Sequence, residues 1–272
     1  MHERGTMRFL YRYYGRLEFV LDVIANKRLY FTPPSDFNDP FDCQPKFSLH
    51  FCKNDPEEDW KRYFFILAKR QYNGIPNSEA QKHAEAAILK GKHRENAWLR
   101  EADEGIKKAL TEQATPPGIC CFSKSPRNPM MWAHYANNHR GIVLQFKASD
   151  MLDHKSGAYK GFDVEYYCRP ISLRRYVEAM EDTLEGDPLA FARLIYCSKS
   201  QEWAGEEEVR FFSQNMYVTY PEEMLTGILF GSKCPAHWQD ITYTLLAMWD
   251  SKPRVFKEDG SISSVKLCFR RA

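Results

Sequence analysis

The amino-acid sequence predicts an α+β fold, in which a mixed β-sheet carries a helical insertion. Short apolar runs, such as residues 119–122 and 142–146, are bounded by turn residues, as is typical of buried strands. Residues 55–112 instead carry apolar side chains at helical spacing among many charged ones. We therefore expect a single domain over residues 1–272, with a helical insertion over about residues 55–115.

The N-terminal residues alternate in a way that predicts a first strand over residues 8–14. One face of this strand would carry Phe9, Tyr11 and Tyr13, and the other would carry Leu10, Arg12 and Tyr14. Apolar spacing predicts a helix over residues 17–26, and residues 29–32 fit a second strand. Residues 33–42 are dense in proline, asparagine and aspartate, so we expect a shaped loop there.

The insertion is predicted to form three helices. The first would have Asp55 as its cap and Pro56 as its first residue, and would end near residue 71. The second would follow a capping box formed by Ser78 and Gln81, and the third would span about residues 92–111. These helices would provide either a docking surface for a partner or only additional bulk.

Residues 118–146 are predicted to form a strand, a turn, a short helix and a second strand. Asn128 suits the cap of a helix that begins at Pro129, because proline has no N–H to leave unsatisfied at that position. His134 and Tyr135 would project from this helix. Two apolar strands thus bracket a turn rich in hydroxyl groups and a helix rich in aromatic side chains, an arrangement that suits a binding site.

The C-terminal half is predicted to complete the sheet. Strands are expected over residues 162–168, 208–212, 226–230, 255–256 and 264–269, and helices over residues 187–198 and 235–249. Glu206, Glu208 and Arg210 fall on one side of the second of these strands, opposite Val209. That side is expected to face water or a cleft.

The composition indicates a well-packed globular protein without a strong net charge. Lysine and arginine number 38 against 36 aspartate and glutamate, so the net charge of +2 gives no global basic field for nucleic acid, although a local patch is still allowed. The 8 cysteines show no C-x-x-C spacing, which argues against a zinc site. No apolar run approaches the roughly 18 residues of a membrane span. The N-terminus has no signal-peptide pattern, and we expect a soluble cytoplasmic protein with no membrane partner.

Glu206, Glu208 and Arg210 are the first candidates for chemistry. Two carboxylates on one strand face repel each other, and Arg210 is the obvious counter-charge. The three residues form either a solvated charge ladder or a site whose carboxylate stabilises a cationic transition state or orients a ribose hydroxyl. The sequence leaves both interpretations open.

Other candidates are polar and aromatic residues that would line a cleft. His134 is either a packing histidine or a polar wall of the cleft, and Ser123 and Ser125 are either turn residues or pocket residues. Arg12 either pairs with a phosphate while neighbouring rings stack a base or nicotinamide, or is an exposed arginine on an aromatic strand. The candidate binding residues are Arg12, Tyr11, Tyr13, Phe41, Asn38, Asp39, Ser123, Ser125, Trp132, His134 and Tyr135. The sequence contains no G-x-S-x-G, P-loop or G-x-G-x-x-G motif.

Four blocks of the sequence together resemble an uncharacterised bacterial family, known as a domain of unknown function. They are Leu29-Tyr30-Phe31 followed by Asn38-Asp39-Pro40-Phe41-Asp42; Cys121-Phe122-Ser123; Met131-Trp132-Ala133-His134-Tyr135 with Gly141; and Trp203 with Glu206-x-Glu208-x-Arg210. The blocks extend over nearly the whole chain. The sequence departs from the family's pattern at Gly205, where the family usually has an aromatic residue.

The order of the motifs also resembles that of ADP-ribosyltransferases, in particular the toxins that modify nucleic acids. This resemblance implies a strongly bent sheet core, NAD as substrate, and Arg12 as the residue that holds the NAD phosphate or ribose. Ser123 and Ser125 resemble the Ser-x-Ser strand that shapes the nicotinamide pocket, and Glu206 or Glu208 would be the catalytic glutamate. The acceptor would be a nucleic acid or a protein, and a toxin or phage-defence effector would fit this chemistry.

Three functional hypotheses follow. The first is an NAD-consuming, ADP-ribosyltransferase-like enzyme in which Glu208 or Glu206, with Arg210 as counter-charge, faces the ribose. The second is a non-catalytic module that binds a nucleotide or peptide in an aromatic cleft. The third is a metal-dependent nuclease, whose ligands would be Asp39, Asp42, His134, His139 and Glu206 or Glu208. No two of these ligands sit in a known metal-binding pattern, so we expect no metal site.

Overall fold

A computed structural model describes residues 9–39, 41–43, 47–112, 118–148, 161–167, 171–259 and 269–271. The described chain is a mixed α+β structure with a mostly antiparallel sheet, as the sequence predicts at this level. The chain divides into two compact units. The first contains residues 1–37, 117–164 and 202–272, and the second contains residues 38–116 and 165–201.

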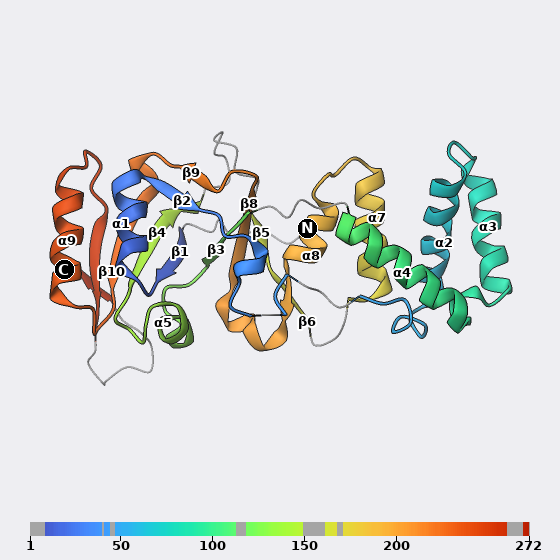
Figure 1. The fold of residues 1–272 in the computed structure, drawn as a ribbon, viewed down its shortest axis with the longest axis horizontal. Coiled ribbons are helices and arrows are strands. Elements are labelled where there is room, and N and C mark those ends of the chain that lie inside the picture. Colours follow the sequence, from blue (N-terminus) through green and yellow to red (C-terminus); the bar gives the residue numbers. More distant parts are fainter. Residues whose placement is uncertain are drawn as a thin grey trace. The chain divides into compact units, whose positions relative to one another are not determined.

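The first unit is built on a sheet with the strand order β12-β11-β10-β4-β1-β3-β8-β5 (Figure 1). These strands are β1 (Phe9–Tyr14), β3 (Gly118–Ser123), β4 (Ile142–Lys147), β5 (Phe162–Asp163), β8 (Glu208–Ser213), β10 (Leu225–Phe230), β11 (Arg254–Glu258) and β12 (Phe269–Arg271). β10 and β11 pair in parallel, whereas the other described pairs of this sheet are antiparallel. The sheet is therefore mixed, and it makes neighbours of β1, β3 and β8, which are far apart in the sequence.

One face of this sheet, called the core face below, is covered by two helices and two short strands. These elements are α1 (Leu17–Asn26), α9 (Ala236–Ala247), β2 (Arg28–Tyr30) and β9 (Tyr217–Thr219), and β2 pairs antiparallel with β9. Leu10, Phe122 and Phe211 lie on this face in one apolar cluster with Ile24 of α1 and Leu246 of α9. Burying a side chain of this size contributes about 1.5–3 kcal/mol, so this cluster is what holds α1 and α9 on the sheet.

The opposite face, called the α5 face below, carries helix α5 (Pro129–Tyr135). Trp132 of α5 is fully buried against Val143 of β4 and Leu229 of β10. Tyr11 and Tyr13 of β1 are partly buried and pack on the same cluster. Alternation along β1 thus sends its tyrosines at positions 11 and 13 to one face and its remaining tyrosine, at position 14, to the other.

The second unit is mainly helical and has its own core. Its elements are α2 (Glu57–Gln71), α3 (Asn77–Leu89), α4 (Asn96–Glu112), α7 (Leu173–Leu184), α8 (Ala190–Tyr196) and the parallel strands β6 (Glu165–Tyr167) and β7 (Ser198–Ser200). Trp60 of α2, Leu99 of α4 and Leu173 of α7 are fully buried in one apolar cluster. The two units together also contain the short 3-10 helices η1 (Pro34–Asp36), η2 (Lys92–Arg94), η3 (Gln201–Glu206) and η4 (Glu222–Met224).

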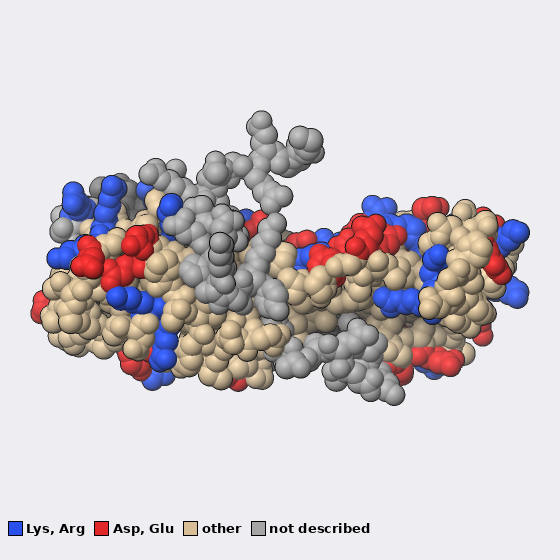
Figure 2. All heavy atoms as spheres, turned by 90° about the horizontal axis from the view of Figure 1, so that it is seen from above, with Lys and Arg blue, Asp and Glu red and all other residues tan. Residues whose placement is uncertain are grey.

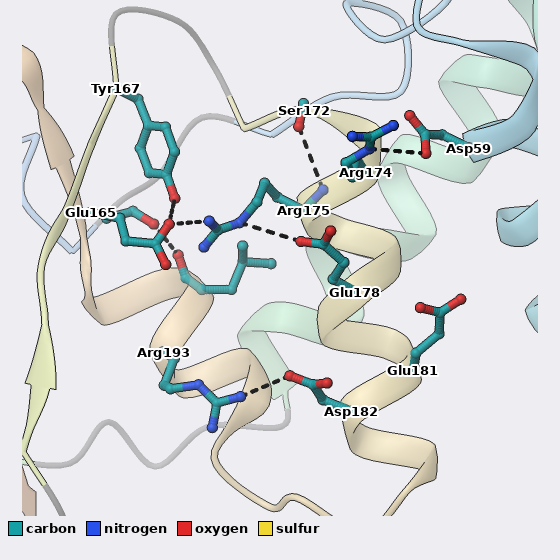
Figure 3. A network of polar contacts seen from close by, with 12 residues as sticks. Asp59, Glu165, Tyr167, Ser172, Arg174, Arg175, Glu178, Glu181, Asp182 and Arg193 are labelled. Carbon is teal, nitrogen blue, oxygen red and sulfur yellow. Dashed lines mark hydrogen bonds and ion pairs between the residues drawn. The ribbon is translucent and has the colours of Figure 1, made fainter. Parts of the chain in front are cut away.

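Ion pairs connect α7 to its neighbours in the second unit (Figure 3). The pairs drawn there are Arg175–Glu165, Arg175–Glu178, Arg193–Asp182 and Arg174–Asp59. Most of these side chains are partly exposed, so each pair contributes at most about 1 kcal/mol. Together they bridge α7 to α2, α8 and β6.

The second unit differs from its prediction in several elements. The helices of the expected insertion lie in this unit, and residues 113–115 lie outside the described residues. Helix α7 has no counterpart in the prediction. The predicted strand over residues 162–168 is two strands, because the chain pairs with β8 before Val164 and with β7 after it, and Cys168 lies outside the described residues. The single domain stays a prediction.

Several helix boundaries also differ. Asp55 does not cap α2, because Pro56 occupies the cap position and the Asp55 carboxylate accepts a hydrogen bond from the Leu173 N–H at 2.8 Å. Helix α3 starts at Asn77, so Ser78 does not precede it. The predicted third helix is η2 followed by α4, and the helices expected over 187–198 and 235–249 are the shorter α8 and α9. Residues 264–268 of the last predicted strand lie outside the described residues.

Charged side chains of both signs are interspersed over the face drawn in Figure 2. This mixture agrees with the net charge of +2. Within the described residues, no helix is long and apolar enough to cross a lipid bilayer.

Candidate functional site

Three side chains from three neighbouring strands line up across the α5 face. Tyr11 of β1 is the register partner of Ser123 of β3, and Ser123 is the register partner of Glu208 of β8. Paired residues point to the same face of a sheet, and neighbouring strands lie about 4.8 Å apart. The backbones of Tyr11 and Glu208 are therefore separated by about 10 Å, with Ser123 between them. These three residues are called the register row below.

Glu208 and Arg210 form a buried ion pair on β8. Arg210 Nε donates to Glu208 Oε1 at 2.8 Å, and Arg210 Nη2 donates to Glu208 Oε2 at 2.9 Å. Glu208 is 6% exposed and Arg210 is 0% exposed. The Phe37 ring lies 5.4 Å from the guanidinium carbon. A buried, bidentate pair fixes the carboxylate in position and favours its ionised form, whereas a solvated charge ladder would leave both groups exposed.

Cys121 of β3, which the sequence analysis does not include among the site residues, is the register partner of Arg210. Burial, and secondarily the neighbouring Glu208 carboxylate, raise the pKa of the Cys121 thiol well above its ordinary value. A neutral thiol is a poor nucleophile. Cys121 therefore forms part of the wall beside Glu208 and is not a candidate for covalent chemistry.

Helix α5 is held against η3 by polar contacts. Asn128 caps α5 as predicted, since its Oδ1 accepts a hydrogen bond from the Met130 N–H at 2.8 Å. The Asn128 Nδ2 in turn donates to the Gly205 carbonyl. The Tyr135 hydroxyl donates to Glu206 Oε1 at 2.7 Å, and Glu206 is 7% exposed. These bonds keep Glu206 beside the C-terminal end of α5.

His134 and Trp203 add an aromatic contact between the same two elements. Their ring centroids lie 6.1 Å apart in an edge-on arrangement. His134 is exposed and Trp203 is partly buried. The structure thus brings His134, Tyr135 and Glu206 together, and their role as walls of a cleft stays a prediction.

The hydroxyl groups of Ser123 and Ser125 take part in the turn between β3 and α5. Ser123 Oγ donates to the Ser125 carbonyl at 3.0 Å and accepts from the Ser125 N–H at 3.1 Å. The Tyr13 hydroxyl donates to the same carbonyl at 2.8 Å. The Trp132 indole N–H donates to the Pro126 carbonyl at 2.7 Å, and its ring lies 5.5 Å from that of Tyr13. These contacts fix the turn beside the register row.

Arg12 lies on the core face, away from the register row. Its guanidinium donates to Cys120 Sγ and, at 3.0 Å, to the Tyr30 carbonyl. The rings of Tyr14 and Phe122 lie 5.4 and 5.9 Å from its guanidinium carbon. The structure therefore does not bring Arg12 together with the other candidate residues of the first unit.

The loop residues Asn38, Asp39 and Phe41 belong to the second unit, and Pro40 lies outside the described residues. The Asp39 carboxylate accepts a hydrogen bond from the Phe41 N–H at 2.9 Å, and the Phe41 side chain is 71% exposed. The loop is shaped by such local bonds, as its composition predicts. The part of these residues in the site stays a prediction.

A buried ion pair and a histidine–glutamate hydrogen bond carry no signal in the sequence, because the partners in each are distant along the chain. In the second unit, Lys199 Nζ lies 3.4 Å from Asp42 Oδ2, with side-chain exposures of 6% and 3%. In the first unit, His139 Nδ1 lies 2.8 Å from Glu258 Oε1, and the imidazole stacks on Trp132 at 5.9 Å. The nuclease hypothesis uses His139 as a metal ligand, whereas the structure places its imidazole against Glu258.

The described residues contain no group of three or more His, Cys, Asp or Glu side chains close enough together to hold a metal ion. Hydrolytic metal sites need several such ligands around one point. The geometry therefore gives no support to the metal-dependent nuclease.

Residues 131–211 match the model of a family described as a protein of unknown function, DUF2971. This segment runs from α5 to β8 and includes Tyr135, Glu206, Glu208 and Arg210. No curated protein and no solved structure matches the chain. The match supports the expected relationship to an uncharacterised family, whereas the likeness to ADP-ribosyltransferases stays a prediction.

Proposed function

We propose that the protein is an ADP-ribosyltransferase-like enzyme that takes NAD as substrate and binds its reacting ribose over the register row. The observation that carries this proposal is the row itself. Tyr11, Ser123 and Glu208 come from the first strand, the Ser-x-Ser strand and the late glutamate strand, and these strands are neighbours in the sheet. Three strands that follow one another in the order of the motifs thus place one side chain each in a row on the α5 face.

The chemistry assigned to Glu208 follows from the charge that develops on the ribose. Breaking the C–N glycosidic bond sends the electron pair to nicotinamide, and C1′ of the ribose gains oxocarbenium character. The Glu208 carboxylate would accept a hydrogen bond from a ribose hydroxyl and stabilise this positive charge. The acceptor nucleophile then donates its electron pair to C1′ and loses its proton. Arg210 is the positioning residue, because it binds both oxygens of Glu208.

Two further residues would contact the substrate and the acceptor. Tyr11 is partly buried, and burial raises the pKa of its hydroxyl, so it offers a neutral ring for stacking. Glu206, held by Tyr135, would face the acceptor. A nucleic acid or a protein would serve as acceptor in this arrangement.

A second candidate is a module that binds a nucleotide without turning it over. The observation in its favour is that both oxygens of Glu208 already accept hydrogen bonds from Arg210. A carboxylate neutralised in this way stabilises an oxocarbenium ion less strongly than a free one. The two candidates share the site and differ in turnover.

The test is nicotinamide release from NAD by the purified full chain, compared among Glu206→Gln, Glu207→Gln and Glu208→Gln. Glu207 is the matched control, because it is the neighbouring glutamate and its side chain is exposed. We expect Glu208→Gln to lower the rate at least about 100-fold, the size of one strong electrostatic contribution. Glu207→Gln should leave the rate unchanged.

Calorimetry with NAD separates the two candidates. Binding of NAD with no nicotinamide release, in the presence of nucleic-acid and protein acceptors, would replace the enzyme by the binding module. Absence of both binding and release from the folded wild type would contradict both candidates. Circular dichroism of each variant verifies that a lost signal is not a lost fold.

A further inference from the structure

Among the residues that the structure describes, none supplies a counter-charge to Arg12. Its side chain is partly buried between Leu10 and Tyr14 on the core face of β1, and its cross-strand neighbour Leu144 is fully buried. The protein acceptors of its N–H groups are the Cys120 sulfur and the Tyr30 carbonyl. Within the described residues, Arg12 makes no ion pair with a carboxylate.

The Cys120 sulfur does not supply the missing negative charge. Burial raises the pKa of the Cys120 thiol to about 11, although the neighbouring Arg12 opposes this shift. The thiol is therefore neutral at physiological pH. A guanidinium has five N–H donors, and only two of those of Arg12 have acceptors in the described chain. A cation that is partly withdrawn from water without a counter-charge carries a desolvation cost that an anion would offset.

A second polar group, next to Arg12, is also incompletely satisfied within the described residues. Tyr14 is 7% exposed, and its hydroxyl has no hydrogen-bond partner within the described residues. The Arg12 guanidinium lies 5.4 Å from the centroid of the Tyr14 ring. A buried hydroxyl that lacks a partner costs about 1–3 kcal/mol. Two polar groups on one strand, two residues apart, are therefore incompletely satisfied within the described residues: Arg12 lacks a counter-charge, and the Tyr14 hydroxyl lacks an acceptor.

We propose that Arg12 and Tyr14 form a binding site for a small oxyanion, a phosphate or a carboxylate group, on the core face of the sheet. Such a group would supply the charge that Arg12 lacks and an acceptor for the Tyr14 hydroxyl at the same time. Planar guanidinium donors match both carboxylate and phosphate oxygens. The one requirement is access, and Arg12 is partly exposed.

This site is separate from the register row. Residues 12 and 14 alternate with Tyr11 and Tyr13 and point to the other face of β1. Asp22, whose charge acts on Tyr14, is bound to Arg28 by hydrogen bonds of 2.7, 3.1 and 3.2 Å. This pairing offsets the negative charge of Asp22, which would otherwise oppose an anion. The inference does not depend on the proposed reaction with NAD.

The experiment is a titration of the full chain with inorganic phosphate, followed by the melting temperature and by calorimetry, against sodium chloride of equal ionic strength. A parallel titration with acetate distinguishes a carboxylate source from a phosphate source. The variants are Arg12→Gln, Tyr14→Phe and, as a control on the other face, Arg254→Gln, whose arginine is exposed. Glu208→Gln is included to report on the register row.

We expect saturable stabilisation of the wild type by phosphate or acetate, beyond that of chloride. Tyr14→Phe should weaken the affinity about tenfold or more, the usual effect of losing a hydrogen bond to a charged group. Arg12→Gln should abolish binding, while Arg254→Gln and Glu208→Gln leave it unchanged. The proposal is overturned if neither anion binds saturably, if Tyr14→Phe binds as tightly as the wild type, or if Glu208→Gln removes binding. Tyr14→Phe keeps the test valid if Arg12→Gln does not fold.

Discussion

Arg12 and Arg210 lie on opposite faces of the same sheet and have opposite kinds of surroundings. Arg210 is fully buried and donates to both oxygens of Glu208. Arg12 is partly buried and donates to a thiol and a carbonyl. The first arginine fixes a carboxylate of the protein, whereas the second pairs with no carboxylate of the described chain. The α5 face thus contains an ion pair between two of its own side chains. The core face contains a cation, Arg12, whose counter-charge a bound anion would supply.

Arg210→Met should have the largest effect on stability of the substitutions that test this difference between the two faces. Removing one partner of a buried ion pair leaves the other charge uncompensated, and we expect the free energy of unfolding to fall by about 3–5 kcal/mol. Urea denaturation measures the change. The double variant Glu208→Gln/Arg210→Met should regain part of the loss, because Gln carries no charge.

Arg12→Met is the matched substitution on the other face. No carboxylate of the described chain depends on Arg12, so we expect a loss of less than about 1.5 kcal/mol, close to that of its hydrogen bonds. Equal losses for Arg12→Met and Arg210→Met would contradict the difference between the two faces.

Tyr135→Phe tests the contact between α5 and η3. It removes the hydroxyl that donates to Glu206 at 2.7 Å, and a hydrogen bond to a charged group contributes about 1.5–3 kcal/mol. We expect a loss within or just below this range in urea denaturation. Met130→Ala is the control, because Met130 lies on α5 with its side chain 60% exposed, and its replacement should change the stability by no more than about 0.5 kcal/mol. A Tyr135→Phe variant as stable as the wild type would mean that this bond does not hold α5.

The Asp22–Arg28 pair gives a pH-dependent contribution near the core face. Hydrogen bonds from Arg28 lower the pKa of the Asp22 carboxyl below its ordinary value, which is about 3.9 in an unfolded chain. The pair therefore stabilises the fold above about pH 4 and loses this effect as the pH falls further.

Comparing the wild type with Arg28→Gln checks this sign. At pH 6 the wild type should be more stable by about 0.2–1 kcal/mol, as for other partly exposed pairs. The difference should shrink between about pH 4 and pH 2. A difference that stays constant over this range would show that Asp22 does not titrate with folding.

Tyr14→Phe should have the smallest effect on stability in the absence of an anion. The substitution removes a buried hydroxyl without a partner in the described chain, so the free energy of unfolding should stay the same or rise by up to about 1 kcal/mol. Denaturation in buffer free of phosphate and carboxylate measures it. A clear loss would mean that the hydroxyl already has an acceptor.

The local pattern of the sequence predicts much of the first unit. Alternation in β1 correctly groups Arg12 with Leu10 and Tyr14, and the Asn128 cap with Pro129 correctly starts α5. These features depend on neighbouring residues alone, through side-chain period and capping. For the same reason the pairing of Glu208 with Arg210 was open to prediction, since both lie on one side of one strand.

The sequence does not reveal which face of a strand faces the site. The alternation of β1 would allow either Arg12 or Tyr11 to lie beside Ser123. Only the register between β1 and β3 shows that Tyr11 is the residue beside Ser123. Contacts such as Lys199–Asp42 and His139–Glu258 join distant segments, and no local pattern marks them. Helix α7 does carry helical apolar spacing, at Leu173, Tyr176, Val177 and Met180, so the prediction missed a local signal that the sequence contains.

The most direct test of the central claim is a crystal structure of the Glu208→Gln variant with NAD, in which slow turnover should keep the substrate intact. We predict that the nicotinamide ribose lies on the α5 face, within hydrogen-bond distance of residue 208 and beside the Tyr11 ring. NAD bound on the core face with its pyrophosphate on Arg12 would contradict the account, because the register row would then have no part in binding.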